Sequence, residues 1–346
     1  MNLVQGSDFP RHSALQGWAS PSRIGVLRQT TLACRRRRTP QLFTRQSSAP
    51  KASQEASRKQ PCTASRRPAR IILVRHGESE GNVDESVYQR KADWDIGLTP
   101  KGVLQAEEAG RQLREIIGSE QRVYFYVSPY KRAKQTCYHL GKDIERHRIA
   151  GVREEPRIRE QDFGNFQDDS MSTIKRERLS YGRFFFRFPN GESASDVYDR
   201  ITGFRETLRS DIDSSRFGRF QDEDDGDINL VVVSHGLALR VFLMRWYKWS
   251  VEQFNLVRNP TNCEIILMSR GSGGRFSLID ENDTAMSEAY ARDLGLDDLM
   301  ISDQIWQSTA TPGELNMDWP TSGSSWFDDF DLNDDPRVFL DKYRSE

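Results

Sequence analysis

The stretch Ile71-Ile72-Leu73-Val74-Arg75-His76-Gly77 decides the fold of this 346-residue chain. Its four apolar β-formers predict a buried strand that ends abruptly at Arg75. An arginine that keeps its charge and a histidine that titrates near neutral pH follow directly. Gly77 allows the backbone to turn sharply or to approach a ligand closely. A tripeptide recurs by chance, so this junction needs support from elsewhere in the chain.

Two further apolar runs end in polar residues of matching kinds. Residues 230–233 are followed by Ser234-His235-Gly236, and residues 123–127 are followed by a helical stretch that begins near Arg132 and Thr136. Ligands of open α/β sheets bind beyond the carboxyl ends of the strands. Either histidine alone is best interpreted as a turn residue, but the pair with its arginines predicts one shared pocket.

Strand and helix patterns alternate through the rest of the core. Thr99-Pro100 predicts a helix start, and Ser193-Ala-Ser-Asp196 resembles a capping box. The runs 263–268 and 275–279 flank a glycine-rich turn and predict a hairpin. We expect an α/β fold, a three-layer sandwich whose mainly parallel sheet has helices on both faces and an antiparallel strand at an edge.

Charge is divided unevenly along the chain. Residues 1–69 contain thirteen Arg and Lys against two acids, a net of +11, whereas residues 280–346 contain seventeen acids against four basic residues, a net of −13. The strand and helix patterns lie between these segments. We therefore predict one globular domain at 70–279, a disordered basic leader at 1–69, and an acidic, largely disordered tail at 280–346.

The leader is rich in Arg, Ser, Ala and Gln and poor in acids, which is typical of an organelle transit peptide. We expect a chloroplast or another organelle, with the cytoplasm as the alternative. The four arginines at 35–38 are a candidate nuclear-import or nucleic-acid patch. No recognised nucleic-acid-binding module accompanies them, so no nucleic-acid partner is expected. No apolar stretch approaches the ~20 residues needed to span a bilayer, so no membrane association is expected either.

The cysteines and the tail say little about chemistry. Cys34, Cys62, Cys137 and Cys263 are dispersed without metal-ligand spacing, which suits a reducing compartment. Aromatic residues among the aspartates of the tail are typical of disordered docking segments, so a protein partner is one interpretation. A solvated, unstructured tail is the simpler one.

The predicted pocket suits a phosphate monoester, which carries close to two negative charges. Arg75 and Arg132 each offer a planar fork for its oxygens, and they lower the pKa of a neighbouring histidine, which keeps it neutral and nucleophilic. A second, protonated histidine can stabilise the transferring group. A carboxylic acid with a raised pKa must protonate the leaving oxygen, and Glu160, Asp162 and Glu78 are equal candidates on the residues alone.

Three segments together resemble the histidine phosphatase superfamily in its phosphoglycerate mutase-like branch. They are residues 73–82 (Leu-Val-Arg-His-Gly-Glu-Ser-Glu-Gly-Asn), residues 128–133 with Thr136, and residues 233–236, in the family's order within 70–279. Segments 159–167 and 181–200 further resemble a plant and fungal subgroup of broad-range acid phosphatase-like proteins. The resemblance implies that His76 is the phosphorylated nucleophile, that Glu160 is the proton donor, and that His235 stabilises the transition state. It also implies a phosphate pocket without metal or cofactor, formed by Arg75, Asn82, Arg132 and Gly236.

The resemblance favours hydrolysis. Cofactor-dependent mutases of this family carry their acid in a Glu-Arg-His-Tyr-Gly type segment with basic residues that grip a bisphosphate, and that segment is absent here. Gln167 stands where the hydrolytic branch often has a second glutamate. We predict a metal-independent phosphomonoesterase that acts on a small phosphorylated metabolite. A mutase-type isomerase and a non-catalytic binder of phosphorylated ligands are the alternatives.

Substrate selectivity is expected from the segment Tyr-Gly-Arg-Phe-Phe-Phe-Arg-Phe at 181–188. Its aromatic residues could form a lid, although most of the phenylalanines are expected in the core. Arg183 and Arg187 are the candidate substrate contacts. Glu192 either contacts substrate or stabilises the helix that begins near Ser193.

Overall fold

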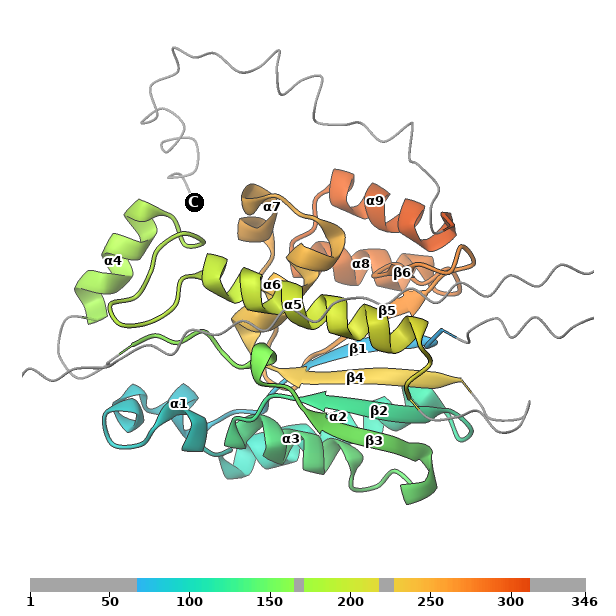
Figure 1. The fold of residues 1–346 in the computed structure, drawn as a ribbon, viewed down its shortest axis with the longest axis horizontal. Coiled ribbons are helices and arrows are strands. Elements are labelled where there is room, and N and C mark those ends of the chain that lie inside the picture. The colour runs from blue at the N-terminus through green and yellow to red at the C-terminus, as the bar shows by residue number, and fades with distance from the viewer. Residues whose placement is uncertain (1–66, 165–170, 218–226, 312–346) are drawn as a thin grey trace, which may run out of the picture. The chain divides into compact units, whose positions relative to one another are not determined.

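The apolar run 71–74 forms the buried interior of β1, which lies near the middle of a mixed sheet (Figure 1). The computed structural model describes residues 67–164, 171–217 and 227–311. Within this part of the chain the sheet has the strand order β3-β2-β4-β1-β5-β6. Its strands are β1 (Arg70–Arg75), β2 (Arg122–Val127), β3 (Ile149–Glu154), β4 (Ile228–Ser234), β5 (Ile265–Arg270) and β6 (Phe276–Ser277).

The first four strands run parallel to one another, and β5 runs antiparallel to β1. The predicted hairpin is present, because β6 pairs antiparallel with β5 and forms the sheet edge beyond it. The α/β fold class and its mainly parallel sheet are therefore confirmed. The antiparallel strand itself lies one position inside the edge.

Helices cover both faces of the sheet (Figure 1). The side chains of β1 alternate between the two faces. Ile71 and Leu73 belong to the core cluster beneath α5 and α6, whereas Ile72 and Val74 belong to the cluster beneath α2 and α3. The helices are α1 (Glu80–Val83), α2 (Pro100–Ile117), α3 (Lys131–Gly141), α4 (Met171–Tyr181), α5 (Ala194–Asp213), α6 (Gly236–Tyr247), α7 (Val251–Leu256), α8 (Thr284–Leu294) and α9 (Asp298–Thr309). Short 3-10 turns lie at Glu85–Gln89, Asp93–Asp95, Arg146–Arg148 and Pro156–Ile158.

Helix α2 packs its first turn directly against the loop that follows β1. A Cβ atom at Gly102 would lie 2.0 Å from the carbonyl oxygen of Glu78, and one at Gly77 would lie 2.5 Å from the carbonyl oxygen of Gly102. Only glycine permits this approach at both positions. Thr99 Oγ1 accepts from the Gly102 amide at 3.0 Å, so the predicted N-cap is confirmed. The capping box at Ser193 is confirmed as well.

The predicted boundary at 279 is wrong, because the chain continues into α8 and α9. Leu294, Met300 and Ile301 are buried in the same core cluster as α5 and α6. Asp293, Asp297 and Asp298 are exposed, and Asp297 caps α9 by accepting from the Met300 amide at 2.8 Å, whereas burial raises the pKa of Asp303 to about 6. The net charge of residues 280–346 therefore concealed two amphipathic helices.

The other predictions for the basic leader and the acidic tail remain predictions. Residues 1–66 and 312–346 lie outside the described residues, and so do the transit-peptide and tail-docking segments. Within the described part, no helix is long and apolar enough to cross a membrane. No group of three or more His, Cys, Asp or Glu in that same part is placed to hold a metal ion.

Leu294→Ala is expected to lower the free energy of unfolding by about 2–5 kcal/mol, because it leaves a cavity where α8 meets the core. Leu294 is 0% exposed. Leu299→Ala, at a position that is 59% exposed, is the matched control and should change the free energy by less than about 0.5 kcal/mol. Urea unfolding measures both, and equal effects would contradict the docking of α8.

Candidate active site

Three parallel strands bring their carboxyl ends together. Arg75 pairs with Ser234 in the register of β1 and β4, so His76 and His235 follow side by side with ring centroids 5.1 Å apart. Ser128 follows β2, the other neighbour of β4, and its Oγ lies 2.7 Å from His235 Nε2. The structure thus places both histidines at one edge of the sheet.

His76 is held in the form that a nucleophile needs. The ring is buried, and Nδ1 lies 2.7 Å from the carbonyl oxygen of Gly77. A carbonyl accepts only from a protonated nitrogen, so the neutral ring has its lone pair on Nε2. Burial, with the nearby charges of Arg132 and Arg75, holds the pKa of His76 well below its ordinary value. The imidazole is therefore neutral over the physiological pH range.

Arg75 and Arg132 present charge to the same space. Arg75 Nη1 donates to the carbonyl oxygen of Pro260 at 2.7 Å, while its buried Nε has no hydrogen-bond partner among the described residues. Arg132 is buried, stacks over the Tyr130 ring at 4.9 Å, and donates through Nη1 to the carbonyl oxygen of Asp93 at 2.7 Å and to its carboxylate at 2.8 Å. Each guanidinium thus uses Nη1 for its hydrogen bonds within the described residues and keeps other N–H groups for an anion.

Thr136 connects the histidine loop to the helix that carries Arg132. Its Oγ1 accepts from the Gly77 amide at 3.1 Å and donates to the carbonyl oxygen of Arg132 at 2.7 Å. The position of His76 relative to Arg132 is therefore fixed by a single side chain.

His235 differs from the expectation in its charge. Burial, followed by the charges of Arg132 and the neighbouring His76, lowers its pKa well below the ordinary value. The ligand-free pocket thus contains a neutral His235, with a buried Nδ1 that has no partner in the described structure. A phosphate dianion would offset the arginine charges and favour protonation, so the predicted cationic form requires bound substrate.

The three candidate acids differ in their surroundings. The Glu78 carboxylate accepts from Lys101 Nζ at 2.7 Å and from Thr99 Oγ1 at 2.9 Å, and Lys101 is the main cause of its lowered pKa. Asp162 is exposed and accepts from the amide two residues further on. Removal from water raises the pKa of Glu160, although Arg132 and Arg75 oppose the shift. Glu160 alone combines a raised pKa with proximity to both arginines.

Glu192 holds the segment that carries Glu160. Its carboxylate pairs with Arg159 and with Arg200, whose Nη2 lies 3.0 Å from Oε2. Arg200 also donates to the carbonyl oxygen of Glu160 at 2.9 Å. Glu192 is thus neither a free substrate ligand nor the cap of α5, a role that Ser193 and its capping-box partner take.

Asn262 joins the site without a signal in the sequence. Its Nδ2 donates to the carbonyl oxygen of His76 at 3.0 Å and to Asn82 Oδ1 at 3.3 Å. Because β5 is antiparallel to β1, the loop before β5 arrives at the edge where β1 ends. Asn82 itself is exposed and caps α1 through the Ser79 amide. Gly236 begins α6, and a Cβ there would lie 3.6 Å from Arg75 Nε.

The proposed lid separates into core and surface residues. Phe184 and Phe188 are buried, whereas Phe185 is exposed. Arg187 is ion-paired with Asp196, the N3 residue of α5. Among the described residues, its side chain makes no hydrogen bond or ion pair with a residue of the histidine pocket. Arg183 is exposed and makes no hydrogen bond or ion pair among the described residues. Gln167 lies outside those residues.

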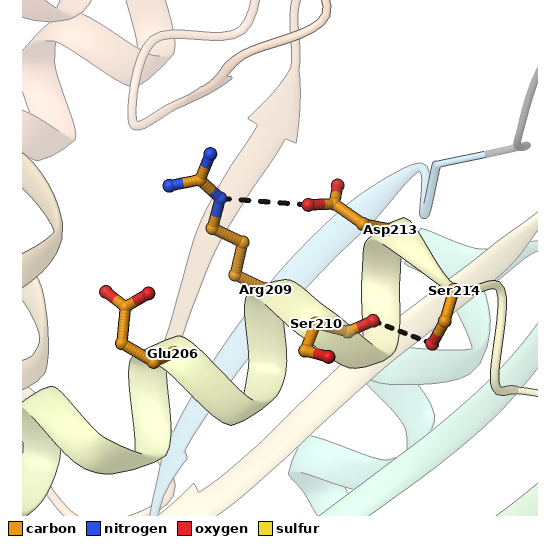
Figure 2. A pocket seen from close by; sticks show the side chains of 5 residues that line it. All are labelled: Glu206, Arg209, Ser210, Asp213 and Ser214. Carbon is orange, nitrogen blue, oxygen red and sulfur yellow. Dashed lines mark hydrogen bonds and ion pairs between the residues drawn. The ribbon is translucent and has the colours of Figure 1, made fainter. Parts of the chain in front are cut away.

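A separate depression on α5 is a poor candidate. It is lined by Glu206, Arg209, Ser210, Asp213 and Ser214, all from the end of one helix (Figure 2). Arg209 and Asp213 pair at 3.7 Å, and Ser214 Oγ donates to the Ser210 carbonyl oxygen at 2.7 Å. Glu206 pairs instead with Arg205 at 2.7 Å, and none of the five residues belongs to the histidine pocket.

Comparison with known proteins identifies the family to which this fold and pocket belong. Residues 71–284 match the family model of the histidine phosphatase superfamily (branch 1), and the chain belongs to this family. It is 49% identical over 269 residues to the phosphoglycerate mutase-like protein AT74 of Arabidopsis thaliana, covering 76% of this chain and 82% of that protein.

Two further similarities are more distant. The broad-range acid phosphatase DET1 of Saccharomyces cerevisiae is 31% identical over 294 residues, covering 58% of this chain and 85% of that protein. A solved mycobacterial glucosyl-3-phosphoglycerate phosphatase is 25% identical, with a TM-score of 0.44, and covers 58% of this chain and 90% of its own.

Proposed function

We propose that this protein is a phosphomonoesterase that works through a phosphohistidine on His76 Nε2 and acts on small phosphorylated metabolites. One observation carries the proposal: a buried, neutral histidine with Nδ1 committed to a carbonyl lies near Arg75 and Arg132. Membership of a histidine phosphatase family supports phosphatase activity. The two arginines supply positive charge, and bound phosphate would favour the protonated form of His235, so the proposed chemistry uses no metal ion.

The reaction would proceed in two balanced steps. Nε2 attacks phosphorus, the bond from phosphorus to the leaving oxygen breaks, and the Glu160 carboxylic acid gives that oxygen its proton. A water then attacks the phosphohistidine, the Glu160 carboxylate takes the water proton, and the bond between phosphorus and nitrogen breaks. Inorganic phosphate leaves, and His76 and Glu160 return to their starting forms.

The test is a hydrolysis screen of the full chain on p-nitrophenyl phosphate, sugar phosphates, phosphoglycerates and nucleotides. We expect phosphate release without a primer and a phosphate adduct on His76 in acid-free mass spectrometry. Interconversion of phosphoglycerates that depends on 2,3-bisphosphoglycerate would favour the mutase alternative instead. Binding of phosphorylated ligands with no turnover of any would favour the regulatory binder.

A further inference from the structure

Three arginines lie beside the pocket on elements other than the strands. They are Arg178 in α4, Arg183 in the loop after it, and Arg240 in α6. Arg240 is only 8% exposed, and its guanidinium lies 4.3 Å from the centroid of the Phe254 ring. The Arg178 guanidinium lies 5.4 Å from the centroid of Phe188. Figure 1 shows α4 on the side of the sheet to which β2 and β4 point.

Within the described residues, no carboxylate is hydrogen-bonded or ion-paired to Arg178, Arg183 or Arg240. Arg240 donates to the carbonyl oxygen of Phe254 at 2.7 Å and to Asn259 Oδ1 at 3.3 Å, both uncharged, and its buried Nε has no partner. The buried Nε of Arg178 has none either. Arg187 nearby shows the opposite arrangement, because Asp196 pairs with it. Buried cations without a counter-charge are costly, and a bound anion would offset that cost.

The three guanidinium groups are close enough to repel one another. Burial, followed by the charges of Arg183 and Arg178, lowers the pKa of Arg240 to about 10. Burial lowers the pKa of Arg178, the charge of Arg183 lowers it further, and the Glu160 carboxylate raises it. Glu160, the proton donor for the leaving oxygen in the proposed reaction, therefore acts on the cluster electrostatically.

A second contact joins the cluster to the phosphate pocket. Asn259, which accepts from Arg240, lies 3.6 Å from the position of a Cβ on Gly236, and Arg75 Nε lies at the same distance from that position. A substrate whose phosphate binds at Arg75 and whose leaving oxygen meets Glu160 would extend its alcohol part toward the three arginines.

We propose that Arg178, Arg183 and Arg240 form a subsite for a second anionic group on the alcohol part of the substrate. The inference rests on the proposed hydrolysis and names its substrate class, phosphomonoesters that carry an additional carboxylate or phosphate. A planar fork suits either anion, so the chemistry is shared between them.

The experiment compares kcat/KM within two substrate pairs. Each pair joins a substrate that has the second anion to one that lacks it: 3-phosphoglycerate with glycerol 3-phosphate, and fructose 1,6-bisphosphate with fructose 6-phosphate. The first pair reports on a carboxylate and the second on a phosphate. We expect the wild type to prefer the member with the additional anionic group in at least one pair. Arg183→Gln should reduce that preference about tenfold, which corresponds to the loss of one charge-assisted hydrogen bond.

Arg187→Gln is the matched control, because it removes an arginine four residues away that Asp196 already neutralises. It should leave the preference unchanged, and Arg183→Lys should restore part of it. Equal kcat/KM within both wild-type pairs, or an equal effect of Arg183→Gln and Arg187→Gln, would overturn the subsite.

Failure of the proposed hydrolysis would look different. The wild type would then release no phosphate even from p-nitrophenyl phosphate. Titration calorimetry of His76→Ala with the same pairs tests the subsite independently of turnover. The subsite is supported if the member with the additional anionic group binds more tightly and if adding Arg183→Gln weakens that binding about tenfold. Equal binding of both members rejects it.

Discussion

His76→Ala is expected to lower kcat/KM for p-nitrophenyl phosphate by about 10⁴-fold or more, because no other group in the pocket can form the covalent intermediate. The neighbouring His235 is held by Ser128, whose Oγ lies 2.7 Å from its Nε2. Removal of the ring relieves a buried group whose pKa is already depressed. We therefore expect the fold to survive the change.

The matched control is His147→Ala, which removes an exposed imidazole from the 3-10 turn before β3, at the end of that strand opposite the pocket. It should keep wild-type activity. Stopped-flow release of p-nitrophenol, phosphohistidine detection by mass spectrometry and a thermal unfolding midpoint would be measured for both variants. A His76→Ala protein that retains a tenth of wild-type activity while folded would show that another residue is the nucleophile.

The pocket could be predicted from sequence where local patterns determine it. The apolar runs before Arg75 and His235 encode buried parallel strands, and parallel neighbours necessarily end at one edge of a sheet. Thr99 with its following proline encodes a helix start for the same local reason. These features depend on a few consecutive residues.

Other parts of the site depend on tertiary contacts. Asn262 reaches His76 only because β5 is antiparallel, and Arg240 interacts electrostatically with Arg178 because α4 lies at the end of the sheet to which β2 and β4 point (Figure 1). Glu192 lies 32 residues after Glu160 and fixes it through Arg200. No period or motif links such positions. The net charge of residues 280–346 gives no sign of α8 and α9, because the stripe that these helices bury is apolar.

Glu160→Gln should separate substrates by their leaving groups. For glycerol 3-phosphate, whose alkoxide needs a proton, we expect kcat/KM to fall by about 10²–10⁴-fold. p-Nitrophenolate leaves without a proton, so His76 should still be phosphorylated quickly. Its hydrolysis would then be slow, because the same carboxylate activates water. Stopped-flow kinetics should show a burst of p-nitrophenol close to one per enzyme, followed by slow turnover.

The pH dependence follows from the two shifted groups. The first step needs neutral His76, whose pKa is lowered, and protonated Glu160, whose pKa is raised. Activity on glycerol 3-phosphate should therefore persist below pH values at which an ordinary histidine becomes protonated, and it should fall as pH rises through the Glu160 pKa. In Glu160→Gln the falling limb should disappear from the residual rate, because glutamine does not titrate.

Asp162→Asn is the control that decides between neighbouring carboxylates. Asp162 is exposed and accepts only a local amide hydrogen bond, so its loss should change kcat/KM by less than about threefold. A larger loss in Asp162→Asn than in Glu160→Gln would exchange their roles. If Glu160→Gln reduced the rate on glycerol 3-phosphate and the p-nitrophenol burst equally, Glu160 would act by holding the pocket in place and not by donating its proton. A selective loss would place the proton on Glu160, because only the leaving oxygen distinguishes the two measurements.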